Sequence, residues 1–213
     1  MSEMQSRKLR GWAAAALAAG LFAAVPLHAE ERLLAGAASD EARQIVGRVT
    51  ATGDNHGMPF VVVDKKAAMV FVFDARGALV GDSSVLLGLA RGDDSAPGIG
   101  DKKLSEIRPE ERTTPAGRFV ASLGYGLGKQ DILWVDYDTS LALHRVSSVS
   151  TKEGRLQRMV STSPLDRRIT FGCINVPAAF YDRVIHPMFT ATNGVVYILP
   201  ETKPVAEVFD FHA

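Results

Sequence analysis

Short apolar runs recur through the middle of the chain. Residues 60–64 (FVVVD) and 69–73 (MVFVF) are rich in β-branched and aromatic residues, and Lys65-Lys66 separates them. Runs of this length and composition, bounded by turn residues, are typical of buried strands. The pattern therefore predicts two strands joined by a tight turn, with a third strand over 78–87.

The other apolar segments extend this pattern to a mainly β prediction. Residues 40–50 are expected to form a short helix with Ser39 or Asp40 as its N-cap. Apolar residues at helical spacing predict a second helix over 176–189. We therefore expect a sheet with one or two helices packed on it. Its further strands are expected at 118–123, 132–137, 141–146 and 195–199.

Polar segments interrupt this pattern in three places. Residues 88–117 contain five glycines and three prolines, and a loop region of that length in a compact domain is usually functional. Residues 147–168 are polar and charged, which predicts a surface insertion. The segment 124–129 (GYGLGK) lacks the spacing of a phosphate-binding loop, so a flexible loop is predicted there.

The first residues have the order of a secretory signal peptide. Arg7, Lys8 and Arg10 precede an alanine-rich apolar stretch over 12–27, and Ala29 offers a small residue for cleavage. The stretch is shorter than the roughly 20 residues of a membrane-spanning helix. We expect an exported protein of the periplasm or cell envelope, cleaved near Ala29, without a transmembrane segment in the mature chain.

The domain boundaries follow from these segments. A signal peptide is expected over 1–29, a leader with a short helix over 30–57, a catalytic domain over 58–200 and a tail over 201–213. The 213 residues carry 24 Lys and Arg against 24 Asp and Glu, so no basic footprint points to nucleic acid. One cysteine excludes an intrachain disulfide, a thiolate zinc cluster and a Cys-x-x-Cys pair.

The single cysteine, Cys173, is the candidate nucleophile. Gly172 before it allows a substrate to approach the backbone closely. Pro177 after it is tolerated in the first turn of a helix, so Cys173 is expected just before a helix start, where a thiol pKa is lowered. The alternative is a buried structural cysteine. The exported setting and the neighbouring glycine favour the nucleophile.

A thiol nucleophile usually needs an imidazole partner. His144 ends the apolar run 141–143, at a strand edge from which its side chain can project into a cleft. His56 lies in a Gly-rich turn, His186 shares a helical face with charged residues, and His212 is in the tail. His144 is therefore the preferred partner, although a strand-edge histidine satisfied by the backbone is the alternative.

The residues around Cys173 resemble the signature of the L,D-transpeptidase catalytic-domain family of bacterial cell-wall enzymes. That signature is a histidine, a spacer, Ser/Thr-His-Gly-Cys, an apolar residue, and Asn or Arg. Residues 114–119 (TPAGRF) are similar to a second family segment, and 61–77 to its opening hairpin. The residues that match the cysteine motif are Thr170, Gly172, Cys173, Ile174 and Asn175.

The resemblance implies the fold and the chemical roles. It implies an L,D-transpeptidase-like β-sandwich in which Cys173 is acylated and His144 is the general base. The backbone carbonyl of Arg145 would orient the imidazole ring. The N–H groups of Gly172 and Cys173 would contribute to the oxyanion hole.

The resemblance also implies a substrate groove, and here the chain departs from the family. Thr170 and Asn175 would shape the groove. Phe171 stands where the family has histidine, and the spacer from His144 to Thr170 holds 25 residues, which is longer than usual. Both departures bear on the substrate and the acceptor more than on the nucleophile.

We therefore expect an exported cysteine transpeptidase that acts on peptidoglycan stem peptides in cell-wall biogenesis and cell shape. Carbapenem-type β-lactams are its expected inhibitors, and neither a cofactor nor a metal is expected. One alternative is a hydrolase on the same scaffold, acting as an L,D-carboxypeptidase or an amidase. Another is a non-catalytic cell-wall-binding module with an inert cysteine.

Overall fold

The computed structural model of the protein describes residues 38–147 and 151–210. The predicted signal peptide and the first part of the leader lie outside the described residues. Within the two described ranges, no helix has the length and apolarity needed to cross a membrane.

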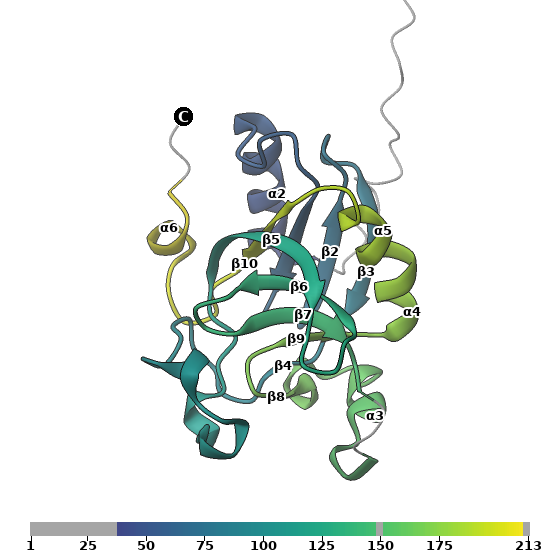
Figure 1. Ribbon diagram of the computed structural model, residues 1–213. Coiled ribbons are helices and arrows are strands. Elements are labelled where there is room, and N and C mark those ends of the chain that lie inside the picture. The colour runs from purple at the N-terminus through teal and green to yellow at the C-terminus, as the bar shows by residue number, and fades with distance from the viewer. Residues whose placement is uncertain (1–37, 148–150, 211–213) are drawn as a thin grey trace, which may run out of the picture.

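Strands dominate the fold and confirm the mainly β prediction (Figure 1). Eight of them form one sheet in the order β3-β2-β1-β10-β5-β6-β7-β9, and β4 pairs with β8 in a small separate sheet. β1 pairs with β10, and β7 with β9, in parallel. The strands are β1 (Phe60–Asp64), β2 (Met69–Phe73), β3 (Leu79–Ser84), β4 (Leu87–Gly88), β5 (Gly117–Tyr125), β6 (Asp131–Asp136), β7 (Leu141–Arg145), β8 (Arg168–Thr170), β9 (Ile174–Val176) and β10 (Gly194–Ile198).

The helices are few and mostly short. The longest is α2 (Asp40–Thr52), and α4 (Ala178–Phe180) continues through a π-helical turn, η7 (Tyr181–Ile185), into α5 (His186–Phe189). The other helices are α3 (Arg155–Met159) and α6 (Val205–Val208), and the 3₁₀ turns are η2 (Ile99–Asp101), η3 (Leu104–Glu106), η4 (Pro109–Glu111), η5 (Thr151–Glu153) and η6 (Pro164–Arg167).

Two apolar clusters lie on opposite faces of the central strands. Along β1, Phe60 and Val62 pack with α2, whereas Val61 and Val63 pack with η7 and α5. Successive side chains of a strand point to opposite faces, so an unbroken apolar run fits a strand covered on both sides. Strands from both ends of the sheet contribute to the cluster under α5, because the sheet curls around it.

The predicted N-terminal helix is confirmed, with Ser39 as its N-cap. The Ser39 hydroxyl accepts a hydrogen bond from the backbone N–H of Ala42 over 3.1 Å. The helix extends to Thr52 and ends at Gly53, whose φ of 69° is left-handed. Such a C-cap favours glycine, which has no Cβ to clash.

The turn between β1 and β2 contains a fully buried charge. The Lys65 ammonium lies 2.7 Å from Asp93 and 3.9 Å from Glu201, and all three side chains are almost completely buried. Lys65 also donates to the backbone carbonyl of Thr114 over 2.9 Å. The cluster therefore ties the β1–β2 turn to the loop after β4, to the segment before β5 and to the chain after β10.

Candidate active site

A cavity of about 750 Å³ opens beside the edge of the sheet that β6, β7 and β9 form. Cys173 and His144 both line it. The 3₁₀ turns between β4 and β5 form one wall, and the β5–β6 loop with Trp134 forms another. The predicted long loop and the predicted Gly-rich loop therefore both face the candidate nucleophile.

A tight turn between β8 and β9 presents Cys173. Gly172 has a φ of 130°, and a Cβ there would lie 2.9 Å from the carbonyl oxygen of Thr113. The hydroxyl of Thr170 donates to the Cys173 carbonyl over 2.7 Å and accepts from the Gly172 N–H over 3.2 Å. The turn is thus built around a glycine and closed by the threonine two residues before it.

Thr114 fastens the same turn from outside. Its hydroxyl donates to the carbonyl of Gly172 over 2.7 Å and accepts from the N–H of Gly88 over 2.8 Å. The carbonyl of Thr114 in turn accepts from the buried Lys65. The segment 114–119 that the sequence singled out therefore supports the cysteine turn at its first residue.

The expectation that Cys173 lies just before a helix start is wrong. Ile174–Val176 form strand β9 against β7, and helix α4 begins only at Ala178, with Pro177 as its N-cap. The predicted helix over 176–189 is accordingly two residues too long at its start. No helix N-terminus within the described residues therefore serves the thiol.

The Cys173 thiol is half-buried and bonded to the backbone. Its sulfur lies 3.7 Å from the carbonyl oxygen of Ser140, to which the thiol donates. Burial raises the pKa of the Cys173 thiol above its ordinary value, and the backbone at Ala142, the charge of Arg155 and the backbone of Cys173 itself oppose this rise. In this conformation the thiol is protonated at neutral pH.

His144 is placed by the ladder between β7 and β9. The parallel register sets Leu143 opposite Ile174 and His144 opposite Asn175. Nδ1 of His144 lies 2.9 Å from the carbonyl oxygen of Arg145, and Nε2 lies 3.1 Å from Nδ2 of Asn175. Burial lowers the pKa of His144, so the ring is neutral at pH 7.

Arg145 is fixed by its side chain as well as by its strand. The guanidinium pairs with Asp131 over 3.0 Å and with Asp182 over 2.6 Å. It also lies 4.1 Å from the ring centre of Tyr181 in η7. The carbonyl that orients His144 therefore belongs to a residue held by β6 and by the π-helical turn.

The other predicted site residues divide between the cavity wall and its support. Phe171 lines the cavity, and the Arg112 guanidinium lies 4.0 Å from its ring centre. Thr170 and Asn175 are buried and do not line the cavity. The hydroxyl of Thr170 occupies the Gly172 N–H, and the N–H of Cys173 faces its own sulfur.

The other histidines lie away from this cavity. His56 follows α2. His186 is the first residue of α5 and lies 3.8 Å from Asp131 of β6. Neither histidine lines the cavity. His212 lies outside the described residues. Across 38–147 and 151–210, no group of three or more His, Cys, Asp and Glu side chains could hold a metal ion.

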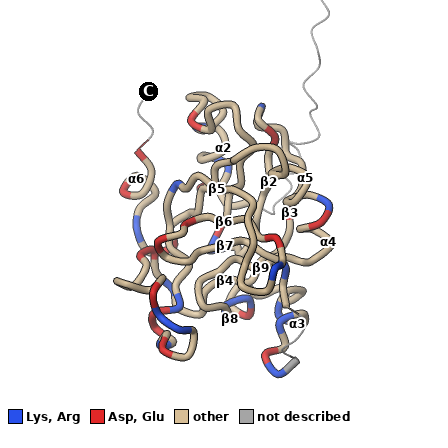
Figure 2. The backbone as a smooth tube through the Cα atoms, viewed as in Figure 1, with Lys and Arg blue, Asp and Glu red and all other residues tan. Residues whose placement is uncertain are grey.

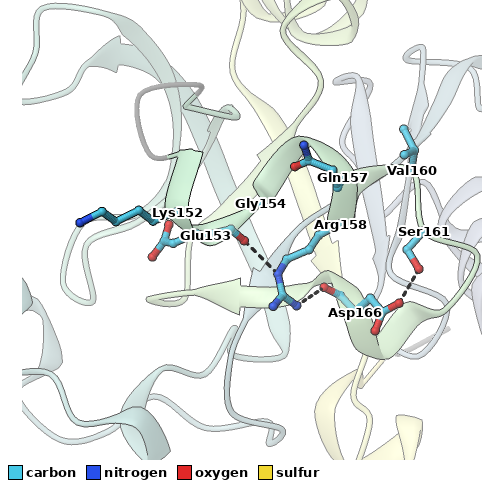
Figure 3. Close-up of a pocket in the computed structure, with 8 residues that line it drawn as sticks. All are labelled: Lys152, Glu153, Gly154, Gln157, Arg158, Val160, Ser161 and Asp166. Atoms are coloured by element: carbon cyan, nitrogen blue, oxygen red, sulfur yellow. Dashed lines mark hydrogen bonds between the residues drawn. The ribbon is translucent and has the colours of Figure 1, made fainter.

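A second hollow, of about 760 Å³, lies on the surface of the 151–167 segment (Figure 3). Arg158 spans it, donating to the backbone carbonyls of Glu153 and Asp166. Neither His144 nor Cys173 lines this hollow. It brings no candidate nucleophile or base together.

Two contributors to the site were not anticipated from the sequence. Ser140 supplies the carbonyl that holds the thiol, and Arg155 donates to Oδ1 of Asn175 over 2.8 Å. Arg155 comes from the polar segment predicted as a surface insertion. A backbone carbonyl carries no sequence signal, and an arginine in a charged segment does not stand out from its neighbours.

Comparisons with known proteins find a likeness to solved structures. No family model matches the chain, and no curated protein matches it. The crystal structure of the L,D-transpeptidase (residues 123–326) from Xylanimonas cellulosilytica DSM 15894 matches with a TM-score of 0.41 and 16% identity. The match covers 66% of this chain and 60% of that one, so less than two thirds of the solved chain has a counterpart here.

Proposed function

We propose that the protein is an exported cysteine transpeptidase that acts on peptidoglycan stem peptides through a thioester on Cys173. One observation carries the proposal: the only cysteine, in the turn that leads into β9, and His144 of the neighbouring parallel strand β7 line the same cavity. The Thr-x-Gly-Cys-Ile-Asn motif supports the substrate class by its resemblance to L,D-transpeptidases.

The reaction follows from the groups at the cavity. His144 takes the thiol proton on Nε2, and the sulfur attacks the carbonyl that joins a diamino acid to D-alanine. The N–H of Cys173 is expected to donate a hydrogen bond to the resulting oxyanion. When the intermediate collapses, the C–N bond breaks, D-alanine leaves with the proton from His144, and a thioester forms. A neighbouring stem amine then attacks the thioester, forms the cross-link and returns the thiol.

The resting arrangement must change before this transfer. The Ser140 carbonyl accepts a hydrogen bond from the Cys173 thiol, and the Asn175 amide is hydrogen-bonded to Nε2 of His144. Catalytic hydrogen bonds are often poorly aligned in free enzymes and tighten when substrate binds. We therefore place the thiol-to-imidazole contact in the substrate complex.

The cavity has the size and lining for a peptide donor. Its volume lies within the roughly 300–1,000 Å³ typical of small-molecule sites. Tyr125 and Leu127 stand exposed on one rim, and Lys102 and Lys103 lie on the other. An apolar wall with Lys103 at its edge suits a peptide that carries a carboxylate, since Lys102 is already paired with Glu111 over 2.6 Å. We extend the proposal to periplasmic localisation and to acylation of Cys173 by carbapenems.

The test is intact-mass spectrometry of the mature protein with a disaccharide-tetrapeptide, with and without an acceptor stem. A Cys173 adduct that becomes a cross-linked dimer supports the transpeptidase. An adduct that yields only shortened peptide points to the hydrolase instead. Cys173→Ala and His144→Ala should abolish the adduct. If the peptide binds but no adduct forms, the result favours the alternative of a non-catalytic cell-wall-binding module.

A further inference from the structure

Arg155 reaches the candidate site from the polar segment between β7 and β8. It is the first residue of α3, and its side chain is only 13% exposed. Nη1 donates to Oδ1 of Asn175 over 2.8 Å, and Nε donates to the Glu153 carboxylate over 2.6 Å. In Figure 1, α3 lies below the edge of the sheet that carries β7 and β9.

The donor chemistry of arginine fixes the orientation of the Asn175 amide. A guanidinium has five N–H donors and no acceptor, so the atom facing it must be the amide oxygen. The amide nitrogen of Asn175 then faces Nε2 of His144, 3.1 Å away. A flipped amide would place N–H groups of Asn175 and Arg155 against each other.

The same chain of donors fixes the proton on His144. Nε2 receives an N–H from Asn175, so Nε2 carries the lone pair. Nδ1 lies 2.9 Å from the Arg145 carbonyl, which can only accept, so Nδ1 carries the hydrogen. An imidazolium would turn Nε2 into a donor facing another donor.

We propose that Arg155 is a positioning residue that, through Asn175, holds His144 as the neutral tautomer protonated at Nδ1, whose Nε2 lone pair accepts a proton once Asn175 releases it. Arg155 does not line the cavity and is not expected to touch substrate. The proposal rests on the proposed function only in taking His144 as the base.

The charges that face His144 agree with this role. Burial has the largest effect and lowers the pKa of His144, the bond to the Arg145 carbonyl raises it, and the charge of Arg155 lowers it further. The same charge favours a thiolate on Cys173. Glu153 offsets part of the Arg155 charge. The Arg145 guanidinium on β7 is itself paired with Asp131 of β6 and with Asp182 of η7.

This role of Arg155 also assigns a function to the long spacer between His144 and Thr170. Phe171 stands where the family motif has histidine, and a phenyl ring can neither donate to the turn nor accept from it through a ring nitrogen. The segment between His144 and Thr170 supplies a polar group from another direction instead. The insertion that the sequence analysis treated as a surface feature thereby reaches the proposed general base.

The test compares Arg155→Met and Arg155→Lys with the wild-type protein. Arg158→Gln is the matched control, because Arg158 lies on the same helix and its side chain donates to the backbone carbonyls of Glu153 and Asp166 (Figure 3), with no bond to Asn175 found among the described residues. Nitrogen-15 NMR of the histidine rings reports the tautomer and the titration midpoint. His144→Gln assigns the His144 signals.

In the wild-type protein and the Arg158→Gln control we expect His144 to be protonated at Nδ1. Arg155→Met should admit the Nε2-protonated form and raise the His144 midpoint, because a positive charge near the ring is lost. Alkylation of Cys173 at pH 7 should slow several-fold, because a nearby positive charge is lost. Arg155→Lys, which keeps a donor and a charge, should recover most of both effects.

Two results would overturn the inference. One is a wild-type His144 protonated at Nε2. The other is a His144 midpoint that does not move in folded Arg155→Met. If Arg155→Met does not fold, the tautomer of His144 in the wild-type protein still decides. Neither NMR readout needs a substrate, so a failed transpeptidase assay leaves this inference intact, and the converse also holds.

Discussion

Asn175 donates its side-chain amide to Nε2 of His144 across 3.1 Å, in a residue pair that the β7–β9 ladder sets side by side. The nitrogen that the proposed reaction needs is therefore occupied in the free protein. The thiol is held separately by Ser140. The proposed nucleophile and the proposed base line one cavity, but each has its own hydrogen-bond partner in the free protein.

The thiol should be slow to react in the free protein. Burial raises the pKa of Cys173, so the thiolate fraction at pH 7 is small. We expect the rate of alkylation by iodoacetamide to keep rising above pH 9, whereas a free thiol levels off near its pKa of about 8.5. The measurement is the alkylation rate against pH by intact mass. A plateau below pH 8 would contradict the assigned environment.

Thr114→Val should loosen the cysteine turn. The substitution keeps the shape of the side chain but removes the bonds to Gly172 and Gly88. Leaving buried groups unpaired should cost about 1–3 kcal/mol of unfolding free energy, measured by urea denaturation. Thr113→Val is the control, because no hydrogen bond of the Thr113 side chain is found among the described residues. Equal losses in both variants would argue against the role of Thr114.

Gly172→Ala should damage the same turn by a steric route. The new Cβ would meet the Thr113 carbonyl at 2.9 Å, and the φ of 130° is itself unfavourable for alanine. We expect a loss of about 1–3 kcal/mol by thermal or urea unfolding, with altered alkylation of Cys173. Gly98→Ala isolates the backbone strain, since Gly98 also has positive φ but open space around it. Gly98→Ala should therefore lose less unfolding free energy than Gly172→Ala.

Lys65→Met should be far more harmful than Lys66→Met. Lys65 is completely buried against Asp93, whereas Lys66 is 47% exposed and pairs with Glu41 at the surface. Removing one partner of a buried pair costs about 3–5 kcal/mol. An exposed pair contributes about 1 kcal/mol or less. Urea denaturation of the two variants measures the contrast, and similar values would show that the Lys65 pair is not buried in solution.

Acid should remove the contribution of Asp93. Burial alone would raise the pKa of this carboxyl, but Lys65, Thr202 and two backbone N–H groups outweigh it and hold the pKa well below its usual range. As pH falls, the unfolded chain takes up the proton first, near its pKa of about 3.9. The stabilisation is therefore complete above about pH 5 and declines below pH 4.

Asp93→Asn gives the corresponding comparison. We expect the variant to be less stable than the wild-type protein at pH 6, because Lys65 loses its charged partner. The gap between the two unfolding free energies should shrink steadily from pH 4 to pH 2. A gap that stays constant over this range would place the pKa of Asp93 at its ordinary value.

Local sequence patterns predicted the strands and the first helix well. The apolar runs around Val62 and Phe71 form buried strands as predicted, and Ser39 caps α2 as expected. The pattern failed at Cys173, where the proline at 177 suggested a helix start close to the thiol. Ile174 and Val176 are β-branched and pair with β7 first, so the helix begins later.

The supports of the site were beyond such patterns. Lys65 and Lys66 are adjacent and chemically alike, yet only Lys65 is buried. Lys65 differs from Lys66 because it pairs with Asp93 and Glu201, which lie far along the chain. Arg155 was missed for the same reason, since its partner Asn175 reaches it only through the fold. Roles that depend on distant partners leave no trace in local periodicity.

The parallel pairing of β1 with β10 affects how this protein can fold. β1 lies at the centre of the sheet, yet Phe60 pairs with Val195, near the other end of the domain. The β1–β2 hairpin can form early, but the centre of the sheet must wait for nearly the whole domain. Closing so long a loop before its contacts form is entropically costly, which slows folding. We expect a slow folder whose β1 edge stays open to misassociation until the last strand docks.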